Sequence, residues 1–205
     1  MTVIISRMNN WNNEKTYSSW NHKKIRNNFV RYSAGILPYT YDLQGRCMFL
    51  LGKDHENDWS DFGGRCEFKD HNDEKMTASR EFYEETLGAV INITDCHDKL
   101  INGNPIKIVS STLNGSPYYM FLLYVDYSNY SETFIKTSNF LRFHYSQNNE
   151  RYNMNKIIEK NCIRWVSIDT LLNCIENNDS TLLKLRGVFY KTIENCKEQL
   201  IKLNK

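Results

Sequence analysis

Short runs of apolar and β-branched residues recur along the chain and predict a set of strands. The expected strands span residues 29–39, 46–52, 90–93, 105–113, 118–127 and 162–166. Pro38 is expected to end the first strand, and a turn at 42–45 joins it to the second, so these two predict a hairpin. The run 118–127 is almost continuously apolar, which favours a place at the centre of the sheet. Residues 53–61 are interpreted as a polar loop.

Residues 73–87 have the pattern of a helix. Asp73 is a plausible N-cap, and Ala78 and Phe82 form an i, i+4 apolar pair that marks the buried side. Gly88 follows the last turn, where a glycine commonly ends a helix. The segment therefore predicts one amphipathic helix between two groups of strands.

The last third of the chain predicts further helices. Ser167 can cap a short helix that reaches residue 175, and a second, amphipathic helix is expected to begin at Ser180. Its apolar positions are Leu182, Leu185, Phe189, Ile193, Cys196 and Leu200. Residues 128–160 show no clear period, and 153–160 fit a helix or a loop. Strands interleaved with helices on both faces predict an α/β/α sandwich with a mixed sheet.

Composition divides the chain into an arm and a domain. Residues 1–29 are polar but contain two tryptophans, and residues 30–205 hold the predicted elements. The chain has 205 residues and a formal net charge of +2, so it lacks the basic excess typical of non-specific nucleic-acid binding. A small basic cluster at 22–26 is interpreted as a solvated arm, with a nucleic-acid contact as the alternative.

The cysteine pattern favours an intracellular environment with reduced thiols.

 Six cysteines are spread over the chain without a C-x-x-C pair, and none has a histidine at zinc-site spacing. The first twenty residues contain no apolar run of the kind that begins a secretory signal. No segment approaches the roughly 18 apolar residues that a membrane span needs. We therefore expect reduced thiols, a cytoplasmic location and no membrane association.

The most informative pattern is Arg80-Glu81-x-x-Glu84-Glu85 within the predicted helix. Positions i, i+3 and i+4 share one helix face, so the three carboxylates converge and repel one another. A divalent cation among them would offset this repulsion, and hard oxygen ligands favour Mg²⁺ or Mn²⁺. Arg80 precedes Glu84 by four residues, so its guanidinium can orient that carboxylate.

A solvated charged face is the competing interpretation of this glutamate row. Gly63-Gly64 precedes the row, and Ala78 lies on the same helix. Both features argue against a chance occurrence of the glutamate spacing. Glycines allow a backbone to come close to a metal or ligand, and the Gly63 carbonyl is a candidate metal ligand. The sequence therefore favours a metal site on this helix.

Residues 63–88, GGRCEFKDHNDEKMTASREFYEETLG, resemble the Nudix box, G-x5-E-x7-R-E-U-x-E-E-x-G-U, where U is a bulky aliphatic residue. Weaker similarity extends to the family's first core strand at 34–37, the approach to the box at 59–64 and the late strand and helix at 163–171. The resemblance covers roughly residues 31–200 and implies the Nudix-type α/β/α fold.

The resemblance also implies roles for particular residues. Glu84 and Glu85 would be the principal metal ligands, Glu81 a further ligand or the base that activates water, and Arg80 their orienting partner. The family often adds an acidic residue from a later loop. Glu159 is the candidate, and Glu150 is its rival.

The chain departs from the box in its spacing. The segment from Gly64 to Arg80 is about two residues longer than the pattern, and Leu87 is an extra residue before Gly88. Counted back from Arg80, the early glutamate of the box falls on Asn72, so that position has no aligned match. These changes concern the loop and leave the glutamate face intact.

The implied activity is Mg²⁺- or Mn²⁺-dependent cleavage of a diphosphate linkage in a nucleoside diphosphate derivative. Removal of the RNA 5′ cap, with capped RNA as partner, is one alternative, and a non-catalytic nucleotide-binding module is another. Arg31, Lys53 and Trp59 are candidates for contacts with a nucleotide-type substrate. The oligomeric state is left open.

Overall fold

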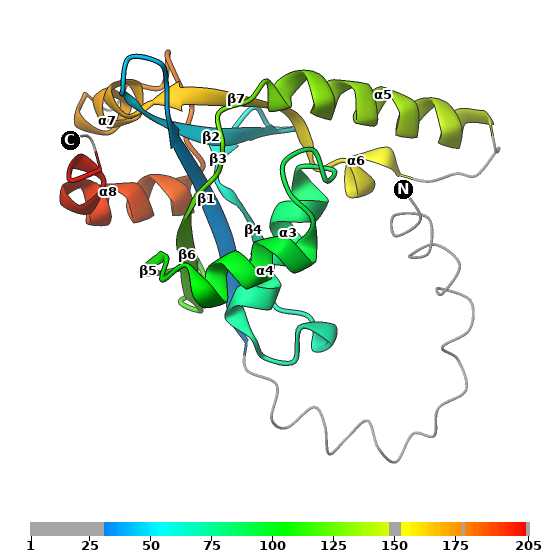
Figure 1. Ribbon diagram of the computed structural model, residues 1–205, viewed down its shortest axis with the longest axis horizontal. Helices are drawn as coiled ribbons and strands as arrows, with labels where there is room; N and C mark the ends of the chain where they lie inside the picture. The colour runs from blue at the N-terminus through cyan, green and yellow to red at the C-terminus, as the bar shows by residue number, and fades with distance from the viewer. Residues whose placement is uncertain (1–30, 148–152, 178, 204–205) are drawn as a thin grey trace. The chain divides into compact units, whose positions relative to one another are not determined.

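The computed structural model describes residues 31–147, 153–177 and 179–203 (Figure 1). The predicted arm 1–29 and the acidic candidate Glu150 lie outside these residues. The strands are β1 (Ser33–Tyr41), β2 (Cys47–Asp54), β3 (Trp59–Ser60), β4 (Phe62–Arg65), β5 (Ile106–Ser111), β6 (Pro117–Tyr124) and β7 (Lys160–Ser167). The helices are the 3-10 turn η1 (Phe68–Asp70), α3 (Glu74–Glu85), α4 (Ile93–Asn102), α5 (Tyr130–Gln147), α6 (Met154–Ile157), α7 (Ile168–Glu176) and α8 (Gly187–Ile201).

All seven strands belong to one mixed sheet, which runs β3-β2-β1-β6-β5, with β4 also on β1 and β7 also on β2. β1 and β6 are parallel, and the other pairs are antiparallel. β1 pairs with β4 over Ser33–Ile36 and with β2 over Tyr39–Tyr41. β1 and β2 therefore separate, and the segment 59–65 fills the gap between them, with β3 on β2 and β4 on β1.

The hairpin of β1 and β2 and the interior position of β6 are confirmed, but the expectation that Pro38 ends the first strand is wrong. β1 continues to Tyr41. Pro38 lies between the stretches that pair with β4 and with β2, and it has no antiparallel partner there. A residue without a backbone N–H is tolerated in a strand where no such hydrogen bond is required.

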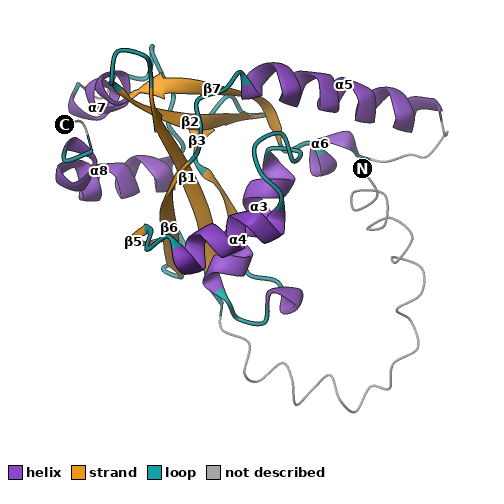
Figure 2. Cartoon of the chain, viewed as in Figure 1, coloured by secondary structure: helices purple, strands orange, loops and turns teal. Residues whose placement is uncertain are grey.

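Helices cover both faces of the sheet, as Figure 2 shows, which confirms the predicted α/β/α sandwich. α3 and α4 pack on one face against β1, β4 and β6, while α7 and α8 pack on the other. Neighbouring side chains in a strand point to opposite faces, so Ile36 and Leu37 are both fully buried. Leu37 belongs to the core beneath α7 and α8 together with Phe189. On the other face, the Phe82 ring of α3 lies 5.3 Å from that of Phe62.

One predicted strand is wrong, and one interval without a predicted element is largely helical. Residues 90–93 do not form a strand, because the Asn92 side chain accepts a hydrogen bond from Asp95 N and caps α4. The polar interval 128–160 contains the long helix α5, whose buried positions are Phe134, Ser138, Leu141 and Tyr145. Their spacing is helical, but the serine and the exposed aromatic residues between them hid the stripe in the sequence.

The last amphipathic helix begins at Gly187 rather than at Ser180. Trp59 explains the difference, since its backbone N–H donates to Lys184 O and its carbonyl accepts from Arg186 N. The segment before α8 is thereby held in an extended form, and Leu182 is 55% exposed. The loop expected at 53–61 is correspondingly shorter, because β2 reaches Asp54 and β3 begins at Trp59.

Among the helices of the described ranges, none combines the length and the apolar composition needed to span a bilayer.

Candidate active site

Helix α3 carries the glutamate row and turns it towards the sheet. Asp73 caps the helix, since its side chain accepts hydrogen bonds from Lys75 N and Met76 N. The side chains of Glu85, Glu81 and Glu84 are 4%, 12% and 25% exposed. A solvated charged face would leave all three in water, so the burial argues against that interpretation.

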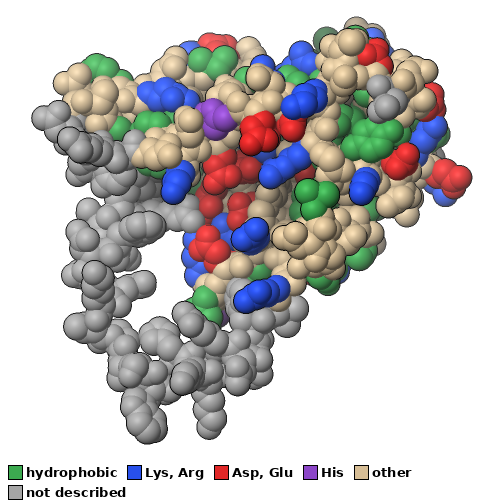
Figure 3. Space-filling model, turned by 180° about the vertical axis from the view of Figure 1, so that it is seen from behind, with side chains coloured by type: hydrophobic (Ala, Val, Ile, Leu, Met, Phe, Trp, Pro, Cys, Tyr) green, Lys and Arg blue, Asp and Glu red, His purple; other side chains and the backbone are tan. Residues whose placement is uncertain are grey.

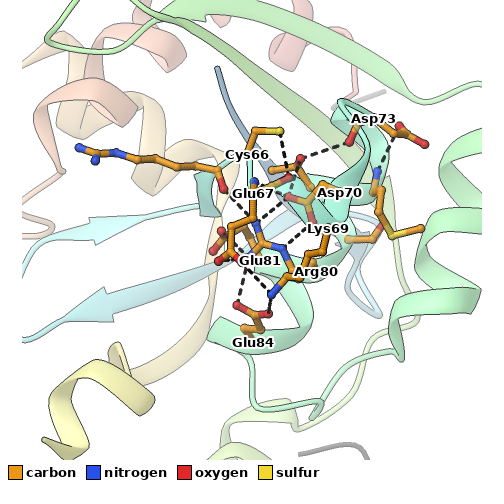
Figure 4. A network of polar contacts seen from close by, with 12 residues as sticks. Cys66, Glu67, Lys69, Asp70, Asp73, Arg80, Glu81 and Glu84 are labelled. Atoms are coloured by element: carbon orange, nitrogen blue, oxygen red, sulfur yellow. Dashed lines mark hydrogen bonds and ion pairs between the residues drawn. The ribbon is translucent and has the colours of Figure 1, made fainter. Parts of the chain in front are cut away.

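Arg80 is the centre of a buried network, which Figure 4 shows. Its Nε and Nη2 donate to the two carboxylate oxygens of Asp70 at 2.8 and 2.9 Å, and Nη2 also donates to Arg65 O at 2.9 Å. Nη1 lies 2.7 Å from Glu81 Oε1 and 3.1 Å from Glu84 Oε2. Paired hydrogen bonds fix a guanidinium in orientation. Arg80 therefore holds two of the three helix carboxylates in place.

Asp70 is a partner that the sequence analysis missed. Burial acts to raise the pKa of Asp70, but the hydrogen bonds from Arg80 and from Glu67 N hold it below its usual value. Asp70 lies six residues after Gly64, the spacing at which the pattern compared with this segment has its early acidic residue, whereas the spacing from Arg80 indicates Asn72. His71 and Asn72, both with positive φ, follow Asp70 and absorb the additional length.

The two glycines of β4 allow the helix carboxylates to approach the sheet. A Cβ on Gly64 would lie 2.5 Å from the Glu81 carboxylate, so a larger residue there would displace it. Gly63 N donates to Glu85 Oε2 at 2.8 Å. Both glycines lie within β4. Gly63 contacts Glu85 through its amide, and the role of its carbonyl as a metal ligand stays a prediction.

Glu85 is paired with a buried lysine at the start of β7. Lys160 is 1% exposed, and its Nζ lies 3.2 Å from Glu85 Oε1 and donates to Ser60 Oγ at 3.0 Å. A Cβ on Gly52 would lie 3.0 Å from Lys160 Cδ, so that glycine leaves the space in which the lysine stem runs. The sequence analysis missed Lys160. The one hint was a glycine inside an apolar strand, which often marks a close approach.

A second buried acid lies beside this pair. Asp61 occupies the break between β3 and β4 and accepts a hydrogen bond from the Tyr118 hydroxyl. Burial raises the pKa of Asp61 to about 6, while the Tyr118 hydrogen bond and the charges of Lys160 and Arg186 act in the opposite direction. Lys160 thus stands between two buried carboxyl groups.

A cavity of about 480 Å³ opens beside Glu85. Its lining residues are Asp54, His55, Glu56, Glu85, Asn155, Lys156, Glu159, Lys160 and Arg186. Glu159 stands immediately before β7, and its charge raises the pKa of both Glu81 and Glu85. Figure 3 shows a face on which acidic side chains gather with basic ones among them. The candidate acidic residue from the late loop therefore comes close to the helix row.

The carboxylate oxygens of this site are the kind of ligand that a hard divalent cation prefers. Burial raises the pKa of Glu81 to about 7 and raises that of Glu85 as well; neighbouring acids add to both shifts, and Arg80 and Lys160 oppose them. The negative charge here is thus only partly offset by the resident cations. In the described part of the chain, no three acidic, histidine or cysteine side chains are already grouped as a metal site. Mg²⁺ needs only one or two carboxylates besides water and phosphate oxygens, which these residues can supply.

The three candidates for substrate contact do not line this cavity. Arg31 is exposed at the start of the described chain. Trp59 is only 7% exposed, and the Arg164 guanidinium lies 4.3 Å from the centre of its ring. Lys53 Nζ lies 5.7 Å from the same ring. The indole therefore offers little surface on which a base could stack.

No protein-family model matches the chain, and no curated protein matches it either. Similar solved structures include the Nudix hydrolase RenU from M. smegmatis, at 12% identity over 84% of this chain and 88% of that one, with a TM-score of 0.46. The C. elegans Ap4A hydrolase has 12% identity over 83% and 98%, with a TM-score of 0.46. The NUDIX domain of Shewanella oneidensis NrtR, complexed with ADP ribose, has 12% identity over 90% and 99%, with a TM-score of 0.46. These similar structures are Nudix proteins, while any chemistry assigned to this chain rests on its own residues.

Proposed function

We propose that the chain is a Mg²⁺- or Mn²⁺-dependent hydrolase that cleaves a diphosphate linkage in a nucleoside diphosphate derivative. The observation that supports it best is the approach of Glu159 to two buried glutamates of α3, at the edge of a cavity. Helical spacing explains why Glu81, Glu84 and Glu85 are neighbours, but it does not explain a fourth acid from a distant segment. An exposed acid brought close to two glutamates that are largely buried adds repulsion, which a positively charged ligand would offset.

In this proposal Glu84, Glu85 and Glu159 would hold the metal, with the Gly63 carbonyl as a further ligand, and Glu81 would be either another ligand or the base that activates water. When bound, the ion supplies neutralisation of phosphate charge and a more acidic water. Arg80 keeps two of the carboxylates in fixed positions, and Glu81 is the candidate to accept the proton of the attacking water. Water adds to one phosphorus, the bridging P–O bond breaks, and a nucleoside phosphate leaves with the bond electrons.

Substrate identity is tested with the full chain and a panel of dinucleoside polyphosphates, ADP-ribose, nucleoside triphosphates, nucleotide sugars and capped RNA. Products are measured with Mg²⁺, with Mn²⁺ and with EDTA. Release of a nucleotide product that needs the metal supports the proposal. Nucleotide binding without such release would instead favour the non-catalytic module. The decapping alternative depends on the arm 1–29, outside the described residues, and capped RNA in the panel tests it directly.

Glu84→Gln is expected to lower kcat on the order of 100-fold, because the amide keeps the shape but loses the charge that a metal requires. Glu84 is the most exposed carboxylate of the α3 row, so the fold should survive. Glu74→Gln is the matched control, since Glu74 lies on the same helix but pairs with Lys107. Steady-state kinetics with the best panel substrate compare the two variants, and equal rates in both would refute the role of Glu84.

Gly64→Ala is expected to lower kcat by about 100-fold, because the new methyl group displaces the Glu81 carboxylate and small misplacements of reacting groups carry such costs. The clash involves side-chain atoms, so the thermal midpoint should change much less than the rate. Gly187→Ala is the control, since no atom lies within 4 Å of a Cβ there. A Gly64→Ala protein with more than half of the normal kcat would contradict the proposed place of Glu81.

A further inference from the structure

Three cationic side chains line the cavity, and they differ in their partners. Lys160 is buried and engaged by Glu85 and Ser60. The side chains of Lys156 and Arg186 make no hydrogen bond or ion pair with any residue of the described ranges. The charge of Arg186 does act to lower the pKa of Asp61 and of Tyr118. These two cations are therefore available to a ligand.

Several other lysines of the domain differ from Lys156 because they are paired with acids. Lys69, Lys136, Lys184 and Lys197 each lie within 4 Å of a carboxylate. Asp54, the last residue of β2, also lines the cavity, and its Oδ1 accepts hydrogen bonds from Glu56 N and Asp58 N. One oxygen of Asp54 is thus engaged by its own loop, while Glu56 and Glu159 also line the cavity.

The backbone holds both cations at the cavity. Arg186 N donates to Trp59 O, and Arg186 O accepts from Tyr190 N in the first turn of α8. Lys156 lies in α6, whose following residue Ile158 is fully buried and accepts a hydrogen bond from His55 Nε2 at 2.7 Å. Each cation therefore enters the cavity from a backbone position that is fixed on both sides.

We propose that Arg186 and Lys156 form the phosphate-binding side of the cavity and hold the substrate's diphosphate opposite Glu85 and Glu159. This inference rests on the proposed function, because a diphosphate is the ligand that such a hydrolase must admit. A cavity lined by glutamates alone repels an anion, and a metal ion offsets only part of that charge. An arginine can bind two phosphate oxygens at once, and a lysine adds a point charge beside it.

The test uses the full chain and inorganic pyrophosphate as the probe, with binding measured by calorimetry in EDTA and in Mg²⁺. We expect Arg186→Gln to raise the Kd of pyrophosphate about 10-fold, Lys156→Gln to raise it several-fold, and Arg186→Lys to restore part of the loss. Lys191→Gln is the control, since Lys191 is an exposed lysine of α8 that does not line the cavity. With a cleaved substrate, KM should rise more than kcat falls.

The results separate this inference from the proposed function. If no panel compound is cleaved but Arg186→Gln weakens pyrophosphate binding, the anion site stands and the hydrolase assignment fails. If cleavage requires Glu84 but Arg186→Gln and Lys156→Gln leave both Kd and KM within twofold of the normal values, the anion site is refuted. Failure of the unchanged protein to bind pyrophosphate at millimolar concentration refutes it as well. Lys156→Gln provides the same test should Arg186→Gln fail to fold.

Discussion

Lys160→Met is expected to destabilise the fold by about 3–5 kcal/mol, the usual cost of removing one partner of a buried ion pair. The side chains of Lys160 and Glu85 are 2% and 4% exposed, so water cannot replace the lost ammonium group at Glu85 Oε1. Methionine fills much of the space beside Gly52, so the loss reports on charge more than on packing. Urea unfolding of the full chain measures the change in the free energy of unfolding.

A double-mutant cycle identifies the cause of that loss. Glu85→Gln alone leaves the Lys160 ammonium group without its carboxylate, and the variant with both substitutions has neither charge. We expect the double variant to be more stable than the sum of the two single losses predicts, because two uncharged partners avoid the unpaired buried charge. Additive losses would show that the pair contributes nothing as a pair, and a Lys160→Met loss below about 1 kcal/mol would contradict the burial argument.

Arg80→Lys is expected to cost about 3–5 kcal/mol although it keeps the positive charge. A single ammonium group cannot reach both Asp70 oxygens, Arg65 O and the two helix glutamates at once. Asp70 would then be buried with part of its hydrogen-bonding capacity unmet. The same change should reduce the proposed activity, since Glu81 and Glu84 lose their common anchor.

Arg46→Lys is the comparison for this prediction. Arg46 also pairs with an aspartate, Asp42, but its side chain is 60% exposed, so water can take over the lost contacts. Thermal and urea unfolding should show no measurable change in that variant. A small effect of Arg80→Lys, similar to that of Arg46→Lys, would mean that the network around Arg80 is not important for stability.

The features that the sequence predicted correctly depend on local rules. The N-cap at Asp73, the i, i+4 pair Ala78 and Phe82 and the spacing of the glutamates are all contained within a few residues of one another. The strands at β1, β2, β6 and β7 were found for the same reason, because each is a short apolar run. Their assembly as a sandwich followed from the order of the elements.

The features that the sequence did not predict depend on contacts between distant segments. In the sequence, nothing distinguishes Lys160 from an exposed lysine at the end of a loop. Its burial depends on the space beside Gly52 and on its ion pair with Glu85, which are far away in the sequence. The extended segment before α8 exists only because its backbone pairs with Trp59. Asp70 is the exception, since its spacing from Gly64 is a local feature that is visible in the sequence.

The hydrogen bond from Lys160 to Ser60 joins residues 100 positions apart, and the same ammonium group pairs with Glu85. During synthesis from the N-terminus, α3 and its glutamates leave the ribosome long before β7 does. Until that strand arrives, Glu85 has Gly63 N as a partner but lacks the lysine that shares its interior position. Charge pairing at Glu85 is therefore a late event, tied to completion of the domain rather than to formation of the helix that carries it.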